Sequence, residues 1–364
     1  MAFRFELGET FLTGIPRIAR EQIGSVVRLL NEKPQASPES IHEARKSLKS
    51  LRAVLRLARG GIRSEFWIRE NQFFRDTGRS LSAARDLQAL LEALDRIANS
   101  RLSKARHPTP EQSALRSLTE EIRRDINQEL VEQLPQESVQ VLVKQLHDAR
   151  RRTASWFQGI LLQPGNEWEL LVGTGLRQTF RKARNLVSQI ETLGHKTAGD
   201  EVWHELRKCA KALGYQLQLL QPIWPATLGT LIDEIDQLSS RLGDANDLAV
   251  LQKRIREKPS SNRDEDQSAR QDLMRAIDHR KQKLRFQALK YARTSYSERP
   301  GQFDRRLAGY WQIWRAKRPA PLRQNRGSCT GAVAELAISK GDPRRIEGDE
   351  GSYRDSVVSR IARR

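Results

Sequence analysis

Two stretches of the chain follow one pattern: HEARKSLKSLR at positions 42–52 and HELRKCAKALG at positions 204–214. Six of the eleven aligned positions are identical. Around each stretch, apolar residues recur at spacings of three and four, as on the buried face of an amphipathic helix. These apolar stripes are Ile41, Ala44, Leu48, Leu51, Leu55 and Ala58 in the first copy, and Trp203, Leu206, Ala210, Leu213, Leu217 and Leu220 in the second. The sequence therefore predicts two similar helices, each with one face in a hydrophobic core.

A second pair of similar segments follows the two copies. LSAARDLQAL occupies positions 81–90 and LGDANDLAVL occupies positions 242–251. The aspartate of the first lies 44 residues after its preceding motif histidine, and that of the second lies 43 residues after its own. Two motifs that recur in the same order with matched spacing predict a tandem duplication. The two halves, each of about 155 residues, would meet near Gln163.

Helical periodicity continues over most of the chain, and no run alternates apolar and polar residues as a strand does. Helix-forming residues dominate, and helix breakers fall between the periodic stretches. The predicted linkers are 31–40, 106–112, 163–166 and 257–268. In the first of them, Ser37 is expected to cap a helix that begins at Pro38. We therefore expect an all-α fold with a dozen or so helices and no sheet.

The duplication and the linkers predict three parts. Residues 1–162 form the first helical half, residues 163–315 form the second, and residues 316–364 form a basic tail. The tail is rich in Gly, Pro, Arg and Ser and poor in aromatic residues, a composition typical of disordered segments.

Basic residues form a second stripe beside each apolar stripe, about 100° further around the helix. The first cationic stripe comprises His42, Arg45, Lys49, Arg52, Arg56 and Arg59, with Lys46 at its edge, and the second comprises His204, Arg207 and Lys211, with Lys208 beside it. Like charges at these spacings destabilise an isolated helix by about 0.2–0.5 kcal/mol per pair. We favour the interpretation that both stripes face an anion. The alternative is a solvated basic face on a basic protein.

Further basic residues lie on two other predicted helices and would wall a central cationic groove or channel together with the stripes. They are Arg177, Arg181, Lys182 and Arg184 on one segment, and Arg75, Arg79 and Arg85 on the other. Asp86 and Asp247 either cap a helix start or orient an arginine of the groove. We favour a structural role for both, because a carboxylate that faced a polyanion would repel it.

The charge balance limits the class of partner. The 364-residue chain carries 64 Lys and Arg against 45 Asp and Glu, a formal net charge of +19. A surface this basic attracts a polyanion, such as nucleic acid, anionic lipid or a phosphate polymer. Cys209 and Cys329 are too far apart to indicate a disulfide scaffold or a four-cysteine zinc site. We expect no membrane span and no signal peptide, and hence a cytoplasmic protein.

No motif for catalysis is recognisable in the sequence. It has no His, Cys and Asp cluster at metal-ligand spacing and no G-x-x-x-x-G-K-[ST] phosphate loop. No nucleophile stands beside a base in a known pattern. We expect a protein that is not an enzyme and that needs no metal or other cofactor.

The H-x-x-R-K-x-x-K helix with its later R/N-D-L segment resembles the CHAD family, named for a conserved-histidine α-helical domain. GLRQTFRKAR at 175–184, the longer stretch at 204–225 and RENQFFRDTGRSLSAARD at 69–86 are also similar to family segments. The resemblance extends from about Phe3 to Trp314. It implies two pseudo-symmetric helical bundles with a basic channel between them.

The resemblance also implies that the channel binds inorganic polyphosphate, often at polyphosphate granules. The family positions carried over are His42, Arg45, Lys46, Lys49, Arg52, His204, Arg207, Lys208 and Lys211. Gly214 departs from the family pattern, because many members keep a basic residue there. The opening FRFELGET lacks the Glu-x-Glu-x-Lys residues of a triphosphate-hydrolase domain, so that activity does not carry over.

Two other functions stay open. One is nucleic-acid binding, although the aromatic residues fall mostly on apolar stripes, as Trp203 and Trp311 do, and offer no stacking platform for bases. The other is a role in phosphate-polymer metabolism, as an enzyme or as an accessory to one.

Overall fold

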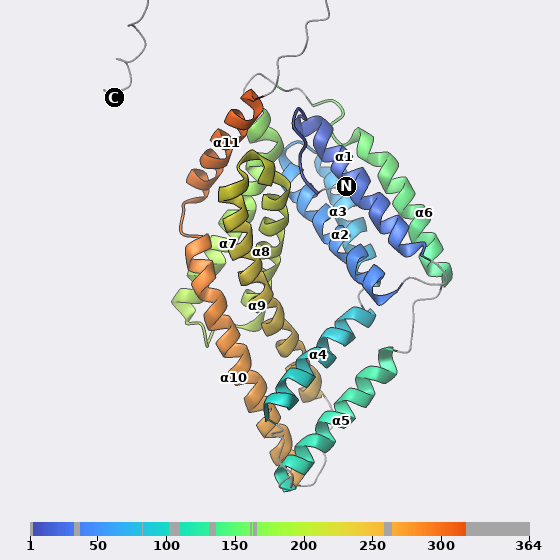
Figure 1. Ribbon diagram of the computed structural model, residues 1–364, viewed down its shortest axis with the longest axis vertical. Helices are drawn as coiled ribbons and strands as arrows, with labels where there is room; N and C mark the ends of the chain where they lie inside the picture. Colours follow the sequence, from blue (N-terminus) through green and yellow to red (C-terminus); the bar gives the residue numbers. More distant parts are fainter. Residues whose placement is uncertain are drawn as a thin grey trace, which may run out of the picture. The chain divides into compact units, whose positions relative to one another are not determined.

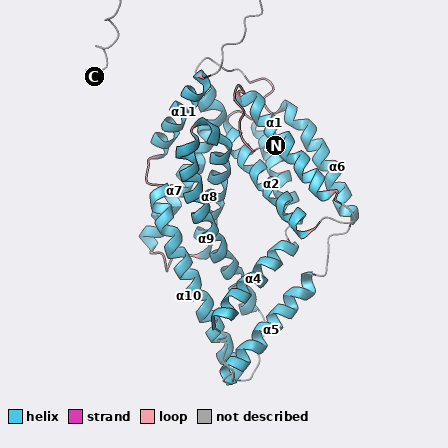
Figure 2. Ribbon diagram, viewed as in Figure 1, coloured by secondary structure: helices cyan, strands magenta, loops and turns pink. Residues whose placement is uncertain are grey.

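The computed structural model describes residues 3–32, 37–81, 83–101, 110–130, 136–160, 162, 166–257 and 264–317. Within these ranges every long element is an α-helix and no residue lies in a strand, which confirms the all-α prediction (Figure 2). The helices are α1 (Phe11–Leu30), α2 (Pro38–Leu57), α3 (Ser64–Ser80), α4 (Ala83–Arg101), α5 (Pro110–Leu130), α6 (Gln136–Arg152), α7 (Thr174–Leu193), α8 (Asp200–Leu220), α9 (Pro225–Glu257), α10 (Asp264–Ser295) and α11 (Pro300–Ala316).

Four short helical turns join these elements. Three are 3-10 turns, η1 (Ala58–Gly60), η2 (Thr153–Ser155) and η4 (Gln221–Ile223), and η3 (Glu169–Gly173) is a π-helix that leads into α7. No helix in the described ranges is long and apolar enough to cross a membrane.

The predicted start of α2 is confirmed. The hydroxyl of Ser37 accepts a hydrogen bond from the backbone N–H of Ser40 at 3.1 Å, and Pro38 occupies the first turn. Proline is tolerated there because the first N–H groups of a helix have no intrahelical partner. The two apolar stripes are also confirmed: all of their members are buried except Ile41, which is partly buried.

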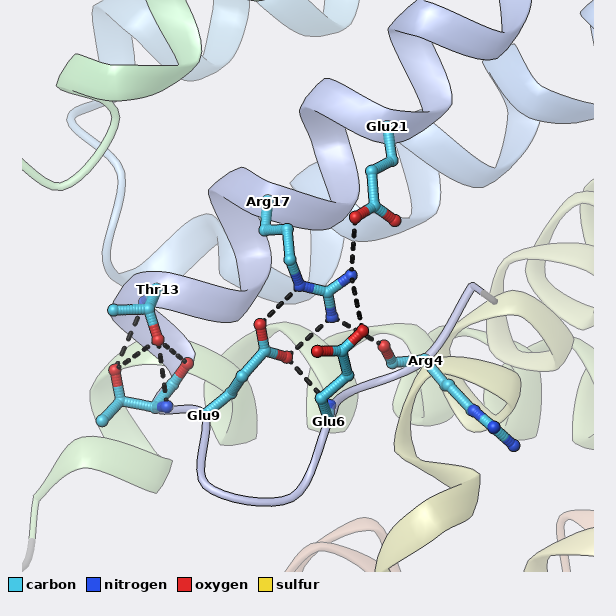
Figure 3. Close-up of polar contacts among 7 residues, drawn as sticks. Arg4, Glu6, Glu9, Thr13, Arg17 and Glu21 are labelled. Carbon is cyan, nitrogen blue, oxygen red and sulfur yellow. Dashed lines mark hydrogen bonds and ion pairs between the residues drawn. The ribbon is translucent and has the colours of Figure 1, made fainter. Parts of the chain in front are cut away.

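The segment before α1 packs on the last described helix, and one arginine fixes this segment to α1. Phe5 and Phe11 pack with Trp311 of α11, and the Phe11 and Trp311 rings stack with centroids 3.9 Å apart. The guanidinium of Arg17 donates to Glu9 at 2.7 Å, to Glu21 at 3.0 Å and to the carbonyl of Arg4 at 3.0 Å (Figure 3). The first and last described helices are thereby held together.

Two hydrophobic cores organise the described helices, whose arrangement Figure 1 shows. The larger core draws on α1, α2, α7, α8 and α11, with parts of α9 and α10. The smaller core is made by α4 and α5 against the later part of α9 and the first two thirds of α10. Each core therefore takes helices from both predicted halves, and the division at residues 162 and 163 stays a prediction.

The order of helix contacts in the second half parallels that in the first. Helix α2 packs on α1 and α3, α4 packs on α5, and α6 packs on α1. Likewise, α8 packs on α7 and α9, α9 packs on α10, and α11 packs on α7. The single helix α9 occupies the place that α3 and α4 share. The duplication itself stays a prediction from the sequence repeat.

Residues Met1–Arg318 make up one compact unit. The predicted basic tail, 316–364, lies outside the described residues from Arg318 onward.

Candidate functional site

The predicted cationic stripes of α2 and α8 come together where these two helices pack. Lys49 is an exposed residue of α2. Partial desolvation between the helices and the positive charges of Arg45, Arg207 and Lys211 lower the pKa of Lys49 to about 8, against an opposing effect of Asp86. Two of those charges belong to α8, so the stripes face one another rather than opposite sides of the protein.

Lys211 experiences the same environment from the other helix. Its pKa is lowered by partial desolvation and by the charges of Arg207 and Lys46, against an opposing effect of Asp236. We call the five residues Arg45, Lys46, Lys49, Arg207 and Lys211 the central cationic cluster. Its lysines are exposed to solvent, whereas Arg45 is buried and Arg207 is partly buried.

The two arginines of the central cationic cluster are less exposed than its lysines. Arg45 donates to Asp86 at 2.8 Å, while its buried Nε has no hydrogen-bond partner. The Nε of Arg207 is also buried without a partner, and it lies 3.7 Å from the position that a β-carbon on Gly243 would take. The charge of Arg207 acts to lower the pKa of Asp247, although burial outweighs it and raises that pKa.

These contacts exclude one of the two interpretations for Asp247 but not for Asp86. Asp86 lies in the first turn of α4 and orients Arg45, so both roles are open to it. Asp247 lies inside α9, far from its start at Pro225, and the capping interpretation is wrong for that residue. Because α9 is continuous where the first half has a break between α3 and α4, no helix begins near Asp247.

His204 is held by an amide side chain of α9 rather than by a backbone carbonyl. Its Nδ1 lies 2.7 Å from Oδ1 of Asn246, whose Nδ2 donates to Asp247 at 3.4 Å. An amide oxygen can only accept, so Nδ1 of His204 carries the proton. The other ring nitrogen, Nε2, then presents a lone pair when the ring is neutral and a second donor when it is charged. His42 is exposed at the equivalent position of α2.

A second group of arginines lies where α3 packs on α2. Arg52 donates to Asn71 at 3.2 Å. Burial, followed by the charges of Arg56, Arg75 and Arg79, lowers the pKa of Arg52 to about 10. Arg75 and Arg79 also pair with Asp76, at 2.9 and 3.9 Å, and their predicted place in the wall of a groove stays a prediction. The Arg85 prediction lies outside the described side chains.

The basic residues of α7 divide into three environments. Arg177 pairs with Glu169 and with the buried Asp304, and Arg184 donates to the carbonyls of Tyr296, Ser297 and Glu298. These two arginines hold structural contacts, and their predicted contacts with a polyanion stay predictions. Arg181 is exposed, and Lys182 faces a cavity.

That cavity has a volume of about 320 Å³ and lies among α2, α3, α7 and α8. Its charged lining residues are Arg56, Arg59, Lys182, Glu205 and Lys208, and Trp67, Gln178, Thr179 and Cys209 complete much of its wall. We call it the basic pocket. The sequence placed Arg56, Arg59, Lys182 and Lys208 on basic helix faces. The contributions of Trp67 and Glu205 were not predicted, because neither belongs to a basic stripe.

No group of three or more His, Cys, Asp or Glu residues that could hold a metal ion occurs in the described part of the chain. The chemistry that the clusters offer is the binding of anions by guanidinium, ammonium and imidazole donors.

A comparison with protein families completes this description. A family model for the CHAD domain matches residues 18–256, about two thirds of the chain. The chain belongs to the CHAD domain family. The CHAD match contains both cationic stripes and the basic pocket, and polyphosphate binding is the function associated with the family. A search of curated proteins finds no match for the chain.

Proposed function

We propose that this CHAD domain binds inorganic polyphosphate at the central cationic cluster and does not process it chemically. The observation that carries the proposal is the position of Lys49, which stands among three other cations from two helices. Such an arrangement is unfavourable in the free protein and becomes favourable when an anion lies among the charges. The family match supports polyphosphate as that anion.

The chemical character of the cluster suits a polymer that carries charge but no bases. Polyphosphate offers only oxygens along a flexible chain, so recognition depends on cations and hydrogen-bond donors at regular spacing. Lys46 and Lys49 are one helical turn apart on α2, and Arg207 and Lys211 are one turn apart on α8. Ammonium and guanidinium groups both donate to phosphate oxygens.

The direct test is titration with fluorescently labelled long-chain polyphosphate at several salt concentrations. We expect affinity to fall steeply with salt, because each phosphate contact releases counterions. Duplex DNA and RNA then compete at equal phosphate concentration and moderate salt. If either displaces polyphosphate, the protein is a nucleic-acid binder and the proposal fails.

A second measurement addresses the absence of turnover. Phosphate release from long-chain polyphosphate is followed with magnesium or manganese present. We expect no release above that of buffer. Turnover that is lost in His42→Ala would make the protein an enzyme of phosphate-polymer metabolism. In cells, we expect a cytoplasmic protein that co-localises with polyphosphate granules, as imaging of a fluorescent fusion would show.

A further inference from the structure

The basic pocket is separate from the exposed lysines of the central cationic cluster and has walls on several helices. Arg56 comes from the end of α2, Arg59 from η1 and Trp67 from α3. Lys182 comes from α7, and Lys208 from α8. Its volume of about 320 Å³ is at the lower end of the range for ligand sites and equals that of about ten water molecules. A compact ligand fits this volume.

The pocket has an excess of positive charge. Four cations line it, and Glu205 is the one carboxylate among its described lining residues. Burial raises the pKa of the Cys209 thiol, so this group adds no negative charge near pH 7. Arg56 makes no ion pair with any residue that the structure describes, and burial lowers its pKa. An anion in the pocket would compensate a charge that the protein leaves uncompensated.

The Glu205 carboxylate already pairs with both lysines of the pocket, where a bound anion would lie. One carboxylate oxygen pairs with Lys182 and the other pairs with Lys208. Burial acts to raise the pKa of Glu205, but hydrogen bonds from the two lysines outweigh it and lower the pKa to about 2. The carboxylate is therefore charged at neutral pH, and it spans the two lysines as two oxygens of a phosphoryl group would.

A ligand that replaces this carboxylate must carry more charge than the carboxylate does. A terminal phosphoryl group has a second ionisation near pH 6 and carries about 1.5 to 2 negative charges at pH 7. An interior phosphate of a linear chain has a single ionisable oxygen. The competition with Glu205 therefore favours chain ends over chain interiors.

We propose that the basic pocket binds the terminal phosphoryl group of a linear phosphate oligomer, which displaces the Glu205 carboxylate from Lys182 and Lys208. Glu205 is then an internal competitor that excludes weaker anions. The inference rests on the proposed function in naming polyphosphate as one source of the phosphoryl group. The other source is a free short oligomer, and both present the same chemistry.

Titration calorimetry with tripolyphosphate tests the pocket directly. We expect Glu205→Gln to raise affinity about fivefold to twentyfold, because each of two partly exposed ion pairs contributes up to a factor of about five. Lys182→Gln should lower affinity several-fold without loss of fold, since its side chain is 57% exposed. Glu191→Gln is the control of equal charge change, because Glu191 pairs with Arg293 at 2.7 Å outside the pocket. This variant should leave the affinity for tripolyphosphate within about twofold of that of the wild type.

Cyclic trimetaphosphate, which has no terminal group, distinguishes end binding from general attraction. We expect it to bind more weakly than tripolyphosphate and to respond little to Glu205→Gln. Equal responses of the cyclic and linear compounds would overturn the proposal, as would an unchanged affinity in both Glu205→Gln and Lys182→Gln.

Long polyphosphate with free or covalently capped ends separates the two sources of the ligand. If chain ends enter the pocket, capping lowers the affinity of the wild type more than that of Lys182→Gln. If only free short oligomers enter, capping has no effect while the tripolyphosphate results hold. Failure of the proposed function has a different result: long polyphosphate does not bind at all, yet tripolyphosphate still responds to Glu205→Gln.

Discussion

Lys49→Gln should stabilise the free protein and weaken polyphosphate binding at the same time. Lys49 is a surface residue whose charged form is disfavoured by partial desolvation and by Arg45, Arg207 and Lys211. Glutamine keeps a polar side chain of similar length and removes the charge. Opposite signs for stability and affinity are what an anion-binding cluster requires, because the repulsion in the free state is relieved only by the ligand.

The magnitude follows from the shift in the pKa of Lys49. A fall from the ordinary value of 10.5 to about 8 corresponds to about 3 kcal/mol for a group shielded from solvent. Lys49 is exposed, so screening reduces this to about 1 kcal/mol. For a domain of this size, that stabilisation raises the melting temperature by about 2 °C. The loss of one phosphate contact lowers affinity about fivefold and reduces the salt slope by about 0.7.

Differential scanning calorimetry and polyphosphate titration measure the two effects on the same samples. Lys283→Gln, an exposed residue of α10, controls for the change in net charge. Adding Lys211→Gln to Lys49→Gln should roughly double both the loss of affinity in free-energy terms and the change in salt slope. A lower melting temperature for Lys49→Gln, or a higher one with unchanged polyphosphate affinity, would refute this reasoning.

Three further predictions concern pH, helix contact and a buried ion pair. Polyphosphate affinity should fall between pH 7 and 9, because Lys49, with its pKa of about 8, loses its proton there, and Lys49→Arg should remove most of that fall. Between about pH 8 and 10.5 this lysine binds a proton more often in the unfolded chain than in the folded protein. Its contribution to the free energy of unfolding should therefore rise with pH in that range. Gly175→Ala should cost about 2–4 kcal/mol in urea denaturation, since a β-carbon there would lie 2.1 Å from the Arg56 carbonyl oxygen. The control Gly78→Ala, whose β-carbon would have nothing within 4 Å, should stabilise the protein by about 0.5–1 kcal/mol. Equal effects of the two substitutions would contradict the close approach of α2 and α7. Glu70→Gln should cost about 2–3 kcal/mol by the same assay, because Glu70 is fully buried and pairs with Arg152 at 2.6 Å, and the exposed Glu65→Gln should cost little.

The individual helices could be predicted from the sequence, but their partners could not. The spacing of Leu48, Leu51 and Leu55 indicates which face of α2 is buried, and the structure buries that face. Periodicity identifies a face without saying what covers it. The packing of α4 and α5 on α9 and α10 was therefore missed, because it joins segments more than a hundred residues apart.

The same limit applies to the site residues: the sequence identifies the helix face on which they lie, but not the partners that they contact. The sequence placed Arg45 and Lys49 on one stripe, since they are one turn apart, but it could not separate the buried arginine from the exposed lysine. It also could not predict the partner of Arg45, because Asp86 comes from another helix. Arg177 and Arg184 were likewise placed on a basic face of α7 by their spacing. Their partners, Asp304 and the carbonyls of residues 296–298, come from distant segments that periodicity does not predict.

The repeated motif therefore combines two kinds of cation with different roles. Each copy contains an arginine that is less exposed than its lysine: Arg45, which pairs with Asp86, and Arg207, whose charge acts on Asp247. Each also has a lysine one turn later, Lys49 or Lys211, that reaches solvent and carries much of the repulsion. A planar guanidinium suits a fixed contact, and a flexible ammonium can follow a mobile phosphate chain. Exchanging the two at one copy, as Arg45→Lys with Lys49→Arg, keeps the net charge yet removes this division. The double variant should therefore lower the free energy of unfolding in urea denaturation, while the salt slope of polyphosphate binding changes little.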